Sequence, residues 1–172
     1  MPPKVASGLR PLSGNSPSLL ILGSFPSVIS LEKGEYYANK RNIFWRIMQS
    51  LFGIDQSLPY NQRVAALSDR GIALWDVISG CSREGSSDSG IKNAIPNDIP
   101  EFLREYPTIR CIALNGATGA GKWFKKIYRD LQDFPGIVIL ILKSTSPANA
   151  GYTYDEKLSE WEKIVEFTRK QD

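Results

Sequence analysis

The stretch Ser18-Leu-Leu-Ile-Leu-Gly23-Ser-Phe-Pro-Ser27 decides how this chain folds. Its apolar run, Leu19 to Leu22, is continuous, which is typical of a strand covered on both faces of a sheet. Gly23 marks a turn, and the polar and aromatic segment Tyr36-Tyr-Ala-Asn-Lys-Arg-Asn-Ile-Phe-Trp45 follows it. An apolar strand that delivers a polar loop is the usual way in which an open α/β sheet builds a binding site.

Three more apolar runs predict strands, at Ile72 to Val77, Arg110 to Leu114 and Ile137 to Leu142. Helical spacing of apolar residues predicts helices at about 43–52, 61–70, 96–106, 117–131 and 155–169. Strands that alternate with helices favour an α/β fold, with three layers (αβα) around a central four-stranded parallel sheet. Polar loops at 24–41, 79–90 and 143–149 follow three of the strands, so they should converge at one edge of the sheet.

The length of 172 residues predicts one domain. Residues 1–17, which contain four prolines, are expected to form a flexible N-terminal arm or a surface strap, and residues 18–172 the domain. The start of the chain lacks the apolar core of a signal peptide, and no apolar run reaches the roughly 18 residues that span a bilayer. We therefore expect a cytoplasmic protein, or a nuclear one in a eukaryotic host, with no membrane partner.

The composition excludes several kinds of chemistry. The chain has no histidine, which removes Ser-His-Asp and Cys-His catalysis and nearly all catalytic zinc sites. Its two cysteines, Cys81 and Cys111, lie beside apolar runs, so we expect buried free thiols and neither a metal nor an iron–sulfur cluster. We expect no cofactor. The net charge of +3 is weak support for an anionic partner. Any chemistry must therefore use carboxylates, amides, hydroxyls, backbone groups and water.

The segment Gly116-Ala-Thr-Gly-Ala-Gly121-Lys122 matches the pattern of a phosphate-binding loop. Trp123 follows it, where that pattern needs the Ser or Thr that holds Mg²⁺. Small residues are also needed wherever two backbones pack closely. The segment therefore leaves two interpretations, which are a nucleotide hydrolase and a close-packed turn.

Several blocks together resemble the uracil-DNA glycosylase superfamily, and most of all its hypoxanthine (deoxyinosine) DNA glycosylase branch. They are Gly23-Ser-Phe-Pro-Ser27, Tyr36 to Trp45, Leu74-Trp-Asp-Val77, Cys81-Ser-Arg-Glu-Gly-Ser86 with Asp88, and Ser144-Thr-Ser-Pro-Ala-Asn149. The similarity extends from about residue 18 to 168, in the order of that family and on a compatible α/β pattern. It implies a uracil-DNA glycosylase-like fold.

The resemblance implies an enzyme that hydrolyses the N-glycosidic bond of a flipped, deaminated base, with hypoxanthine expected first. No lysine is placed as a Schiff-base nucleophile, so a monofunctional enzyme is expected. The partner would be DNA that contains a deaminated base, and the protein would act as a monomer. The alternatives are a uracil or mismatch DNA glycosylase, and a catalytically inactive nucleic-acid-binding module of the same fold.

The resemblance places the catalytic side chain at Asn39. The third position of the first block, where the mismatch-specific branch has a catalytic Asn, is Phe25 in this chain. An amide cannot deprotonate water, so Asn39 would orient the water and hold the leaving base. Asn39 could instead form a turn, and the carboxylates of Asp76 and Asp88 are rival catalytic groups.

The remaining site residues also follow from the resemblance. Tyr37 would stack on the flipped base, and Phe25 and Ser24 would line its pocket. The expected DNA contacts are Arg83 and Ser86 at the rim, and Ser144, Thr145, Ser146 and Asn149 in the last block. Lys143 stands where the family pattern has proline and would add charge near the phosphates. An ordinary Ser/Thr turn is the alternative for the last block.

Overall fold

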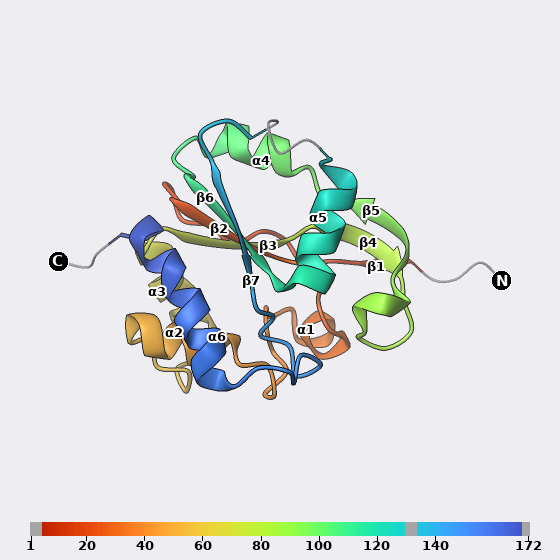
Figure 1. The fold of residues 1–172 in the computed structure, drawn as a ribbon, viewed down its shortest axis with the longest axis horizontal. Helices are drawn as coiled ribbons and strands as arrows, with labels where there is room; N and C mark the ends of the chain where they lie inside the picture. Colours follow the sequence, from red (N-terminus) through yellow and green to blue (C-terminus); the bar gives the residue numbers. More distant parts are fainter. Residues whose placement is uncertain (1–4, 130–133, 170–172) are drawn as a thin grey trace.

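In the computed structural model, residues 5–129 and 134–169 are described. A parallel sheet with the strand order β3-β2-β6-β7 forms its centre (Figure 1). The strands are β2 (Leu19–Gly23), β3 (Ile72–Asp76), β6 (Cys111–Asn115) and β7 (Val138–Leu142). The predicted α/β class and the four-stranded parallel sheet are therefore confirmed. In the register of the sheet, Gly23 lies opposite Asp76 at the carboxyl ends of β2 and β3.

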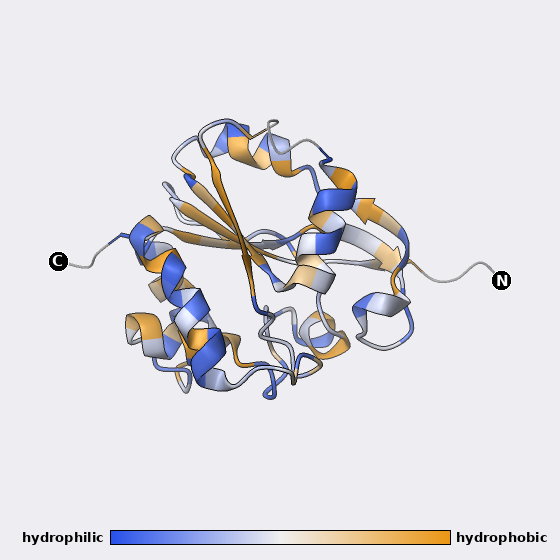
Figure 2. Ribbon diagram, viewed as in Figure 1, coloured by the Kyte–Doolittle hydropathy of each residue, from blue (hydrophilic) through white to orange (hydrophobic). Residues whose placement is uncertain are grey.

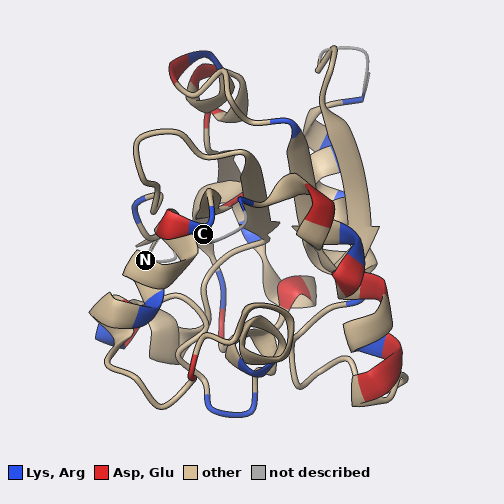
Figure 3. Cartoon of the chain, turned by 90° about the vertical axis from the view of Figure 1, so that its left-hand side faces the viewer, with Lys and Arg blue, Asp and Glu red and all other residues tan. Residues whose placement is uncertain are grey.

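Helices cover both faces of this sheet, and the sheet separates two hydrophobic clusters, one on each face. One cluster contains Leu19 and Ile21 of β2 and the helices α2 (Phe44–Phe52), α3 (Tyr60–Asp69) and α6 (Tyr154–Trp161). The other contains Leu20 and Leu22 with α4 (Ile99–Glu105) and α5 (Lys122–Ile127). Successive residues of a strand point to opposite faces, so a continuous apolar run serves both clusters. The strands are accordingly the most uniformly hydrophobic part of the fold (Figure 2), and charged residues lie mainly on helices and loops (Figure 3).

The expectation of uninterrupted polar loops after the first two strands was wrong. The 24–41 segment contains α1 (Val28–Lys33), which begins where Ser27 Oγ accepts a hydrogen bond from the backbone N–H of Ser30. The 79–90 segment begins with β4 (Ile78–Ser82) and ends in a 3₁₀ turn, η1 (Asp88–Gly90). The strand β4 belongs to a second, antiparallel sheet with β1 (Ala6–Ser7) and β5 (Lys92–Pro96). Its Ser and Gly residues weaken the apolar pattern from which a strand is predicted.

The described part of the N-terminal segment lies against both sheets. Ala6 and Ser7 pair with β4, and Leu12 exchanges two backbone hydrogen bonds with Leu74 of β3, at 2.8 and 2.9 Å. These contacts are those of a surface strap. The division of the chain into an arm and one domain stays a prediction.

Three predicted helices are shorter than expected. The helix predicted at 96–106 is α4, which begins only at Ile99 because residues 92–96 form β5. The helix predicted from residue 117 starts as a π-helical turn, Gly116–Gly121 (η2), before α5, and its predicted end at 131 lies outside the described residues. The last helix changes from α6 to a 3₁₀ segment, η4 (Glu162–Phe167). None of the helices in the described part of the chain is long and apolar enough to cross a membrane.

Candidate active site

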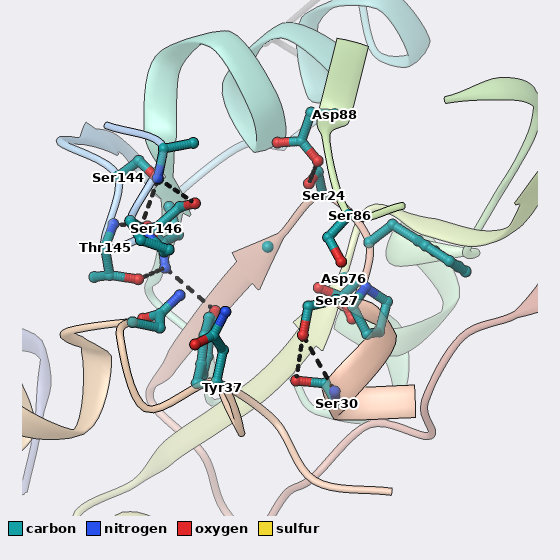
Figure 4. Close-up of a pocket in the computed structure, with 18 of the residues that line it drawn as sticks. Ser24, Ser27, Ser30, Tyr37, Asp76, Ser86, Asp88, Ser144, Thr145 and Ser146 are labelled. Atoms are coloured by element: carbon teal, nitrogen blue, oxygen red, sulfur yellow. Dashed lines mark hydrogen bonds between the residues drawn. The ribbon is translucent and has the colours of Figure 1, made fainter. Parts of the chain in front are cut away.

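A pocket of about 290 Å³ opens at the carboxyl edge of the parallel sheet (Figure 4). Its walls come from the end of β2 and the turn after it, the loop before α2, the end of β3, the loop that contains η1, the end of β6 and the loop after β7. In Figure 4, Ser144, Thr145 and Ser146 lie on one side of the hollow and Ser24, Ser86 and Asp88 on the other. The three polar loops therefore converge as the sequence predicted.

Tyr37 forms part of the pocket wall in an uncommon backbone conformation. Its φ of 56° lies in the left-handed region, which costs a bulky residue free energy and is found mostly at functional sites. The ring stacks on Phe44, with 4.0 Å between ring centroids and 22° between planes, and Tyr37 Oη accepts a hydrogen bond from Asn115 Nδ2 at 3.4 Å. Burial, followed by the charge of Asp76, raises the pKa of Tyr37, which keeps the phenol neutral. The fold thus holds this aromatic ring at the pocket.

Asp76 ends β3 inside the pocket and lies against the backbone of Gly23. A Cβ atom on residue 23 would stand 2.5 Å from Asp76 Oδ1, so any side chain there would have to displace the Asp76 carboxyl group. The residue is only 5% exposed, and its Oδ2 atom is buried with no hydrogen-bond partner among the described residues. Burial raises the pKa of Asp76 to about 7; the Asp88 charge adds to this effect and the Arg83 charge opposes it. Asp76 therefore holds a proton well above the usual range of a carboxylic acid.

Asp88 faces the same pocket but has a partner. Ser24 Oγ donates a hydrogen bond to Asp88 Oδ1 at 2.6 Å, so the hydroxyl predicted to line the base pocket is committed to this carboxylate. Burial still raises the pKa of Asp88, although the Ser24 hydrogen bond and the Arg83 charge oppose it. The two pocket carboxyl groups thus differ, because Asp88 accepts a hydrogen bond and Asp76 Oδ2 accepts none from the described residues.

The Gly116–Gly121 turn packs behind this wall and does not line the pocket. A Cβ atom at Gly119 would overlap the Asp88 carboxylate, and one at Gly116 would lie 3.0 Å from Ser144 Cβ. The glycines are therefore explained by close packing, which was one of the two interpretations of this segment.

Asn39 lines the pocket together with Asn42. Asn39 Oδ1 accepts a hydrogen bond from the backbone N–H of Arg41 at 3.0 Å, so the turn-forming role is present. Its Nδ2 group has no hydrogen-bond partner among the residues that the structure describes. Asn42 Oδ1 accepts from the N–H of Phe44 at 2.9 Å, at the start of α2. The amide group of Asn39 thus keeps two donor hydrogens for a ligand, which is compatible with the predicted role.

The loop after β7 is a Ser/Thr turn whose hydroxyl groups are unequal. Thr145 is buried, and it exchanges two hydrogen bonds with the Asn115 side chain, at 2.9 and 3.0 Å. Ser144 Oγ and Ser146 Oγ line the pocket and accept hydrogen bonds from backbone N–H groups two residues on, so each keeps a hydroxyl hydrogen to donate. Thr145 therefore anchors the loop, and Ser144 and Ser146 remain available to phosphates.

Two residues at the ends of this loop are held by α6. Asn149 does not line the pocket, and its backbone oxygen accepts a hydrogen bond from Lys157 Nζ at 2.7 Å. Lys143 Nζ forms an ion pair with Glu160 Oε2 at 2.6 Å. The extra charge expected near the phosphates is thus offset by a carboxylate.

Of the predicted rim and base contacts in the first half of the chain, some line the pocket and one supports a turn behind it. Ser86 lines the pocket, and its Oγ accepts a hydrogen bond from the N–H of Val28 at 3.0 Å. Arg83 points inward and donates a hydrogen bond to the Pro26 carbonyl, with its guanidinium 5.0 Å from the ring centroid of Phe25. Phe25 touches the pocket but is only 7% exposed. In this structure, Arg83 supports the turn after β2 and does not line the pocket.

Sequence reasoning missed Asn115, which joins the Tyr37 and Thr145 sides of the pocket. The polar loops after the other three strands contain several polar residues each and therefore give a stronger sequence signal. Its place at the carboxyl end of an apolar strand was the available signal, because ligands bind at that edge of a parallel sheet. No group of three or more His, Cys, Asp or Glu side chains that could hold a metal ion occurs within residues 5–129 and 134–169.

The chain is an α/β protein with a polar and aromatic pocket at the carboxyl edge of its parallel sheet. The family model of the uracil DNA glycosylase superfamily matches residues 11–167, so the chain belongs to that superfamily. The predicted membership and fold are confirmed.

Named relatives narrow the comparison. The chain is 34% identical over 161 residues to a hypoxanthine DNA glycosylase of Methanosarcina acetivorans, covering 93% of this chain and 98% of that protein. It is also 34% identical over 143 residues to a hypoxanthine DNA glycosylase of Methanosarcina barkeri, covering 83% and 87%. A solution NMR structure of a candidate uracil DNA glycosylase from M. acetivorans superposes with a TM-score of 0.80, at 32% identity, and covers 95% of this chain and 99% of that one.

Proposed function

We propose that this protein is a monofunctional DNA glycosylase that hydrolyses the N-glycosidic bond of a deaminated base, above all hypoxanthine. The observation that carries the proposal is the pocket itself, which combines the Asn39 amide, the Tyr37 ring and the Ser144 and Ser146 hydroxyls at one sheet edge. Superfamily membership and the two relatives named as hypoxanthine DNA glycosylases support the same activity. That the protein is a monomer and cytoplasmic stays a prediction.

The pocket groups suit a base that has left the duplex. An extruded base must be held by stacking and by hydrogen bonds to its edge, and Tyr37 and Asn39 offer both. Ser144 and Ser146 would bind the phosphates of the extruded nucleotide, which fixes its position without reading sequence. The Asn39 amide would orient the attacking water at C1′ of the sugar, because a positioned reactant lowers the barrier even without proton transfer.

A substrate panel tests the proposal. Duplexes with a single deoxyinosine, deoxyuridine or deoxyxanthosine are incubated with the protein without added metal, and abasic sites are then cleaved with alkali. We expect cleaved strand chiefly from the deoxyinosine duplex, and only after the alkali treatment. Asn39→Ala should reduce the rate by at least 100-fold, whereas Asn42→Ala, from the same loop, should keep most of it because its Oδ1 atom is occupied by the backbone N–H of Phe44. Preference for deoxyuridine would indicate the uracil branch, and binding without product an inactive module.

A further inference from the structure

The proposed reaction lacks a proton donor. Cleavage of the C1′–N9 bond leaves the electron pair on the purine, and protonation of the leaving base stabilises that charge. The Asn39 amide has no proton acidic enough for this step. The carboxylic acids that line the pocket among the described residues are Asp76 and Asp88, and their surroundings distinguish them.

The carboxyl group of Asp76 is the less constrained of the two. It lies at the strand end, 5% exposed, and its buried Oδ2 has no hydrogen-bond partner in the described part of the chain. Asp88 instead accepts the Ser24 hydroxyl at 2.6 Å. A buried polar atom without a partner is costly to the fold, and at the wall of a pocket a bound ligand can supply the missing partner.

The surroundings also keep Asp76 protonated. The groups that face it are Asp88 of the second polar loop, Arg83 after β4, and the phenols of Tyr36 and Tyr37. Burial and the Asp88 charge raise the pKa of Asp76 to about 7, against the opposing effect of Arg83. A general acid works best when its pKa lies near the working pH. At neutral pH, about half of the molecules would carry this proton.

We propose that Asp76 is the general acid that protonates the departing purine, an inference that rests on the proposed glycosylase function. As the C1′–N9 bond breaks, its electron pair moves into the purine, which takes the Asp76 proton on an acceptor atom facing the carboxyl group. The resulting carboxylate offsets the positive charge on the sugar. The oxygen of water then bonds to C1′, and the proton that the water loses returns to Asp76. Base and abasic sugar leave, and the acid is restored.

Single-turnover excision from a deoxyinosine duplex between pH 5 and pH 9 tests this step. The wild-type rate should fall above about pH 7, tenfold per pH unit, as Asp76 loses its proton. Asp76→Asn keeps the size of the side chain but carries no acidic proton, so at pH 6 it should be slower by about 100-fold or more and should lack the falling limb. In Asp88→Asn the falling limb should move to lower pH, because the Asp88 charge helps to raise the Asp76 pKa.

Binding separates chemistry from folding. Affinity for a duplex with 2′-fluoro-deoxyinosine, whose glycosidic bond resists cleavage, should change less than threefold in Asp76→Asn. An Asp76→Asn rate within threefold of wild type at pH 6, or a retained falling limb, would overturn the inference while leaving the glycosylase activity intact. A wild-type protein that releases no base would instead refute the proposed function and this step with it.

Discussion

Asp76→Asn should be more stable than the wild type, and the difference should grow as the pH rises. The folded chain raises the Asp76 pKa from its ordinary 3.8 to about 7, so between these values the folded state holds a proton that the unfolded state has lost. The free energy of unfolding therefore falls with rising pH through this window, and the loss is complete above pH 7. Asparagine does not titrate and is free of this effect.

The size of the effect follows from the shift. A change of about three pKa units corresponds to about 4 kcal/mol at high pH, an upper value for a fully buried group, and about 3 kcal/mol of it develops between pH 5 and pH 8. Other groups titrate alike in both proteins and cancel in the difference. Proteins keep such costs at functional sites, where the strained or unpaired group serves the chemistry.

Urea unfolding followed by tryptophan fluorescence measures this difference at pH 5, 6, 7 and 8. The free energy of unfolding of Asp76→Asn, minus that of the wild type, should grow by about 3 kcal/mol across the series. In Asp88→Asn the loss of stability should be smaller and should end at a lower pH, because one cause of the raised pKa of Asp76 in the folded state is removed. A difference that stays constant with pH would refute the reasoning, since Asp76 would then titrate alike in both states.

Three further changes test the pocket. Gly23→Ala places a Cβ atom 2.5 Å from Asp76 Oδ1 and should reduce excision by about 100-fold or more; a rate within threefold of wild type would contradict the assigned contact. Tyr37→Leu removes the ring and should weaken binding of a non-cleavable deoxyinosine duplex by about tenfold, as measured by fluorescence anisotropy, with equal affinity arguing against base stacking. Ser144→Ala combined with Ser146→Ala should weaken binding to damaged and undamaged duplexes alike, by about 1 kcal/mol per lost hydrogen bond, and a loss confined to damaged DNA would indicate base contact instead.

The central sheet could be predicted because each of its strands is a run of four or five apolar residues between turn signals. The Leu19–Leu22 run indicates burial on both faces, and Gly23 indicates where the chain must turn. The second sheet could not be predicted in this way. Its strand β4 has the sequence Ile-Ser-Gly-Cys-Ser, and its stability comes from pairing with β1 and β5, which are distant in sequence.

The candidate site was predicted where the sequence places several polar groups in one block and missed where it places one. The 36–45 and 144–149 blocks reach the pocket as expected. The sequence predicts Thr145 as a phosphate contact, but its hydroxyl accepts a hydrogen bond from Asn115, a single polar residue at a strand end. Within residues 5–129 and 134–169, Asp76 Oδ2 has no hydrogen-bond partner, and no local sequence pattern reveals this because it results from tertiary packing.

The measurement that tests the central claim most directly is product analysis of a duplex with one deoxyinosine. Mass spectrometry follows the free base and the intact strand over a single turnover. The account predicts that the wild type releases hypoxanthine and leaves an unbroken abasic strand. In Asn39→Ala, neither free hypoxanthine nor the abasic strand should form. Strand breakage without alkali, or unchanged release of hypoxanthine by Asn39→Ala, would contradict it.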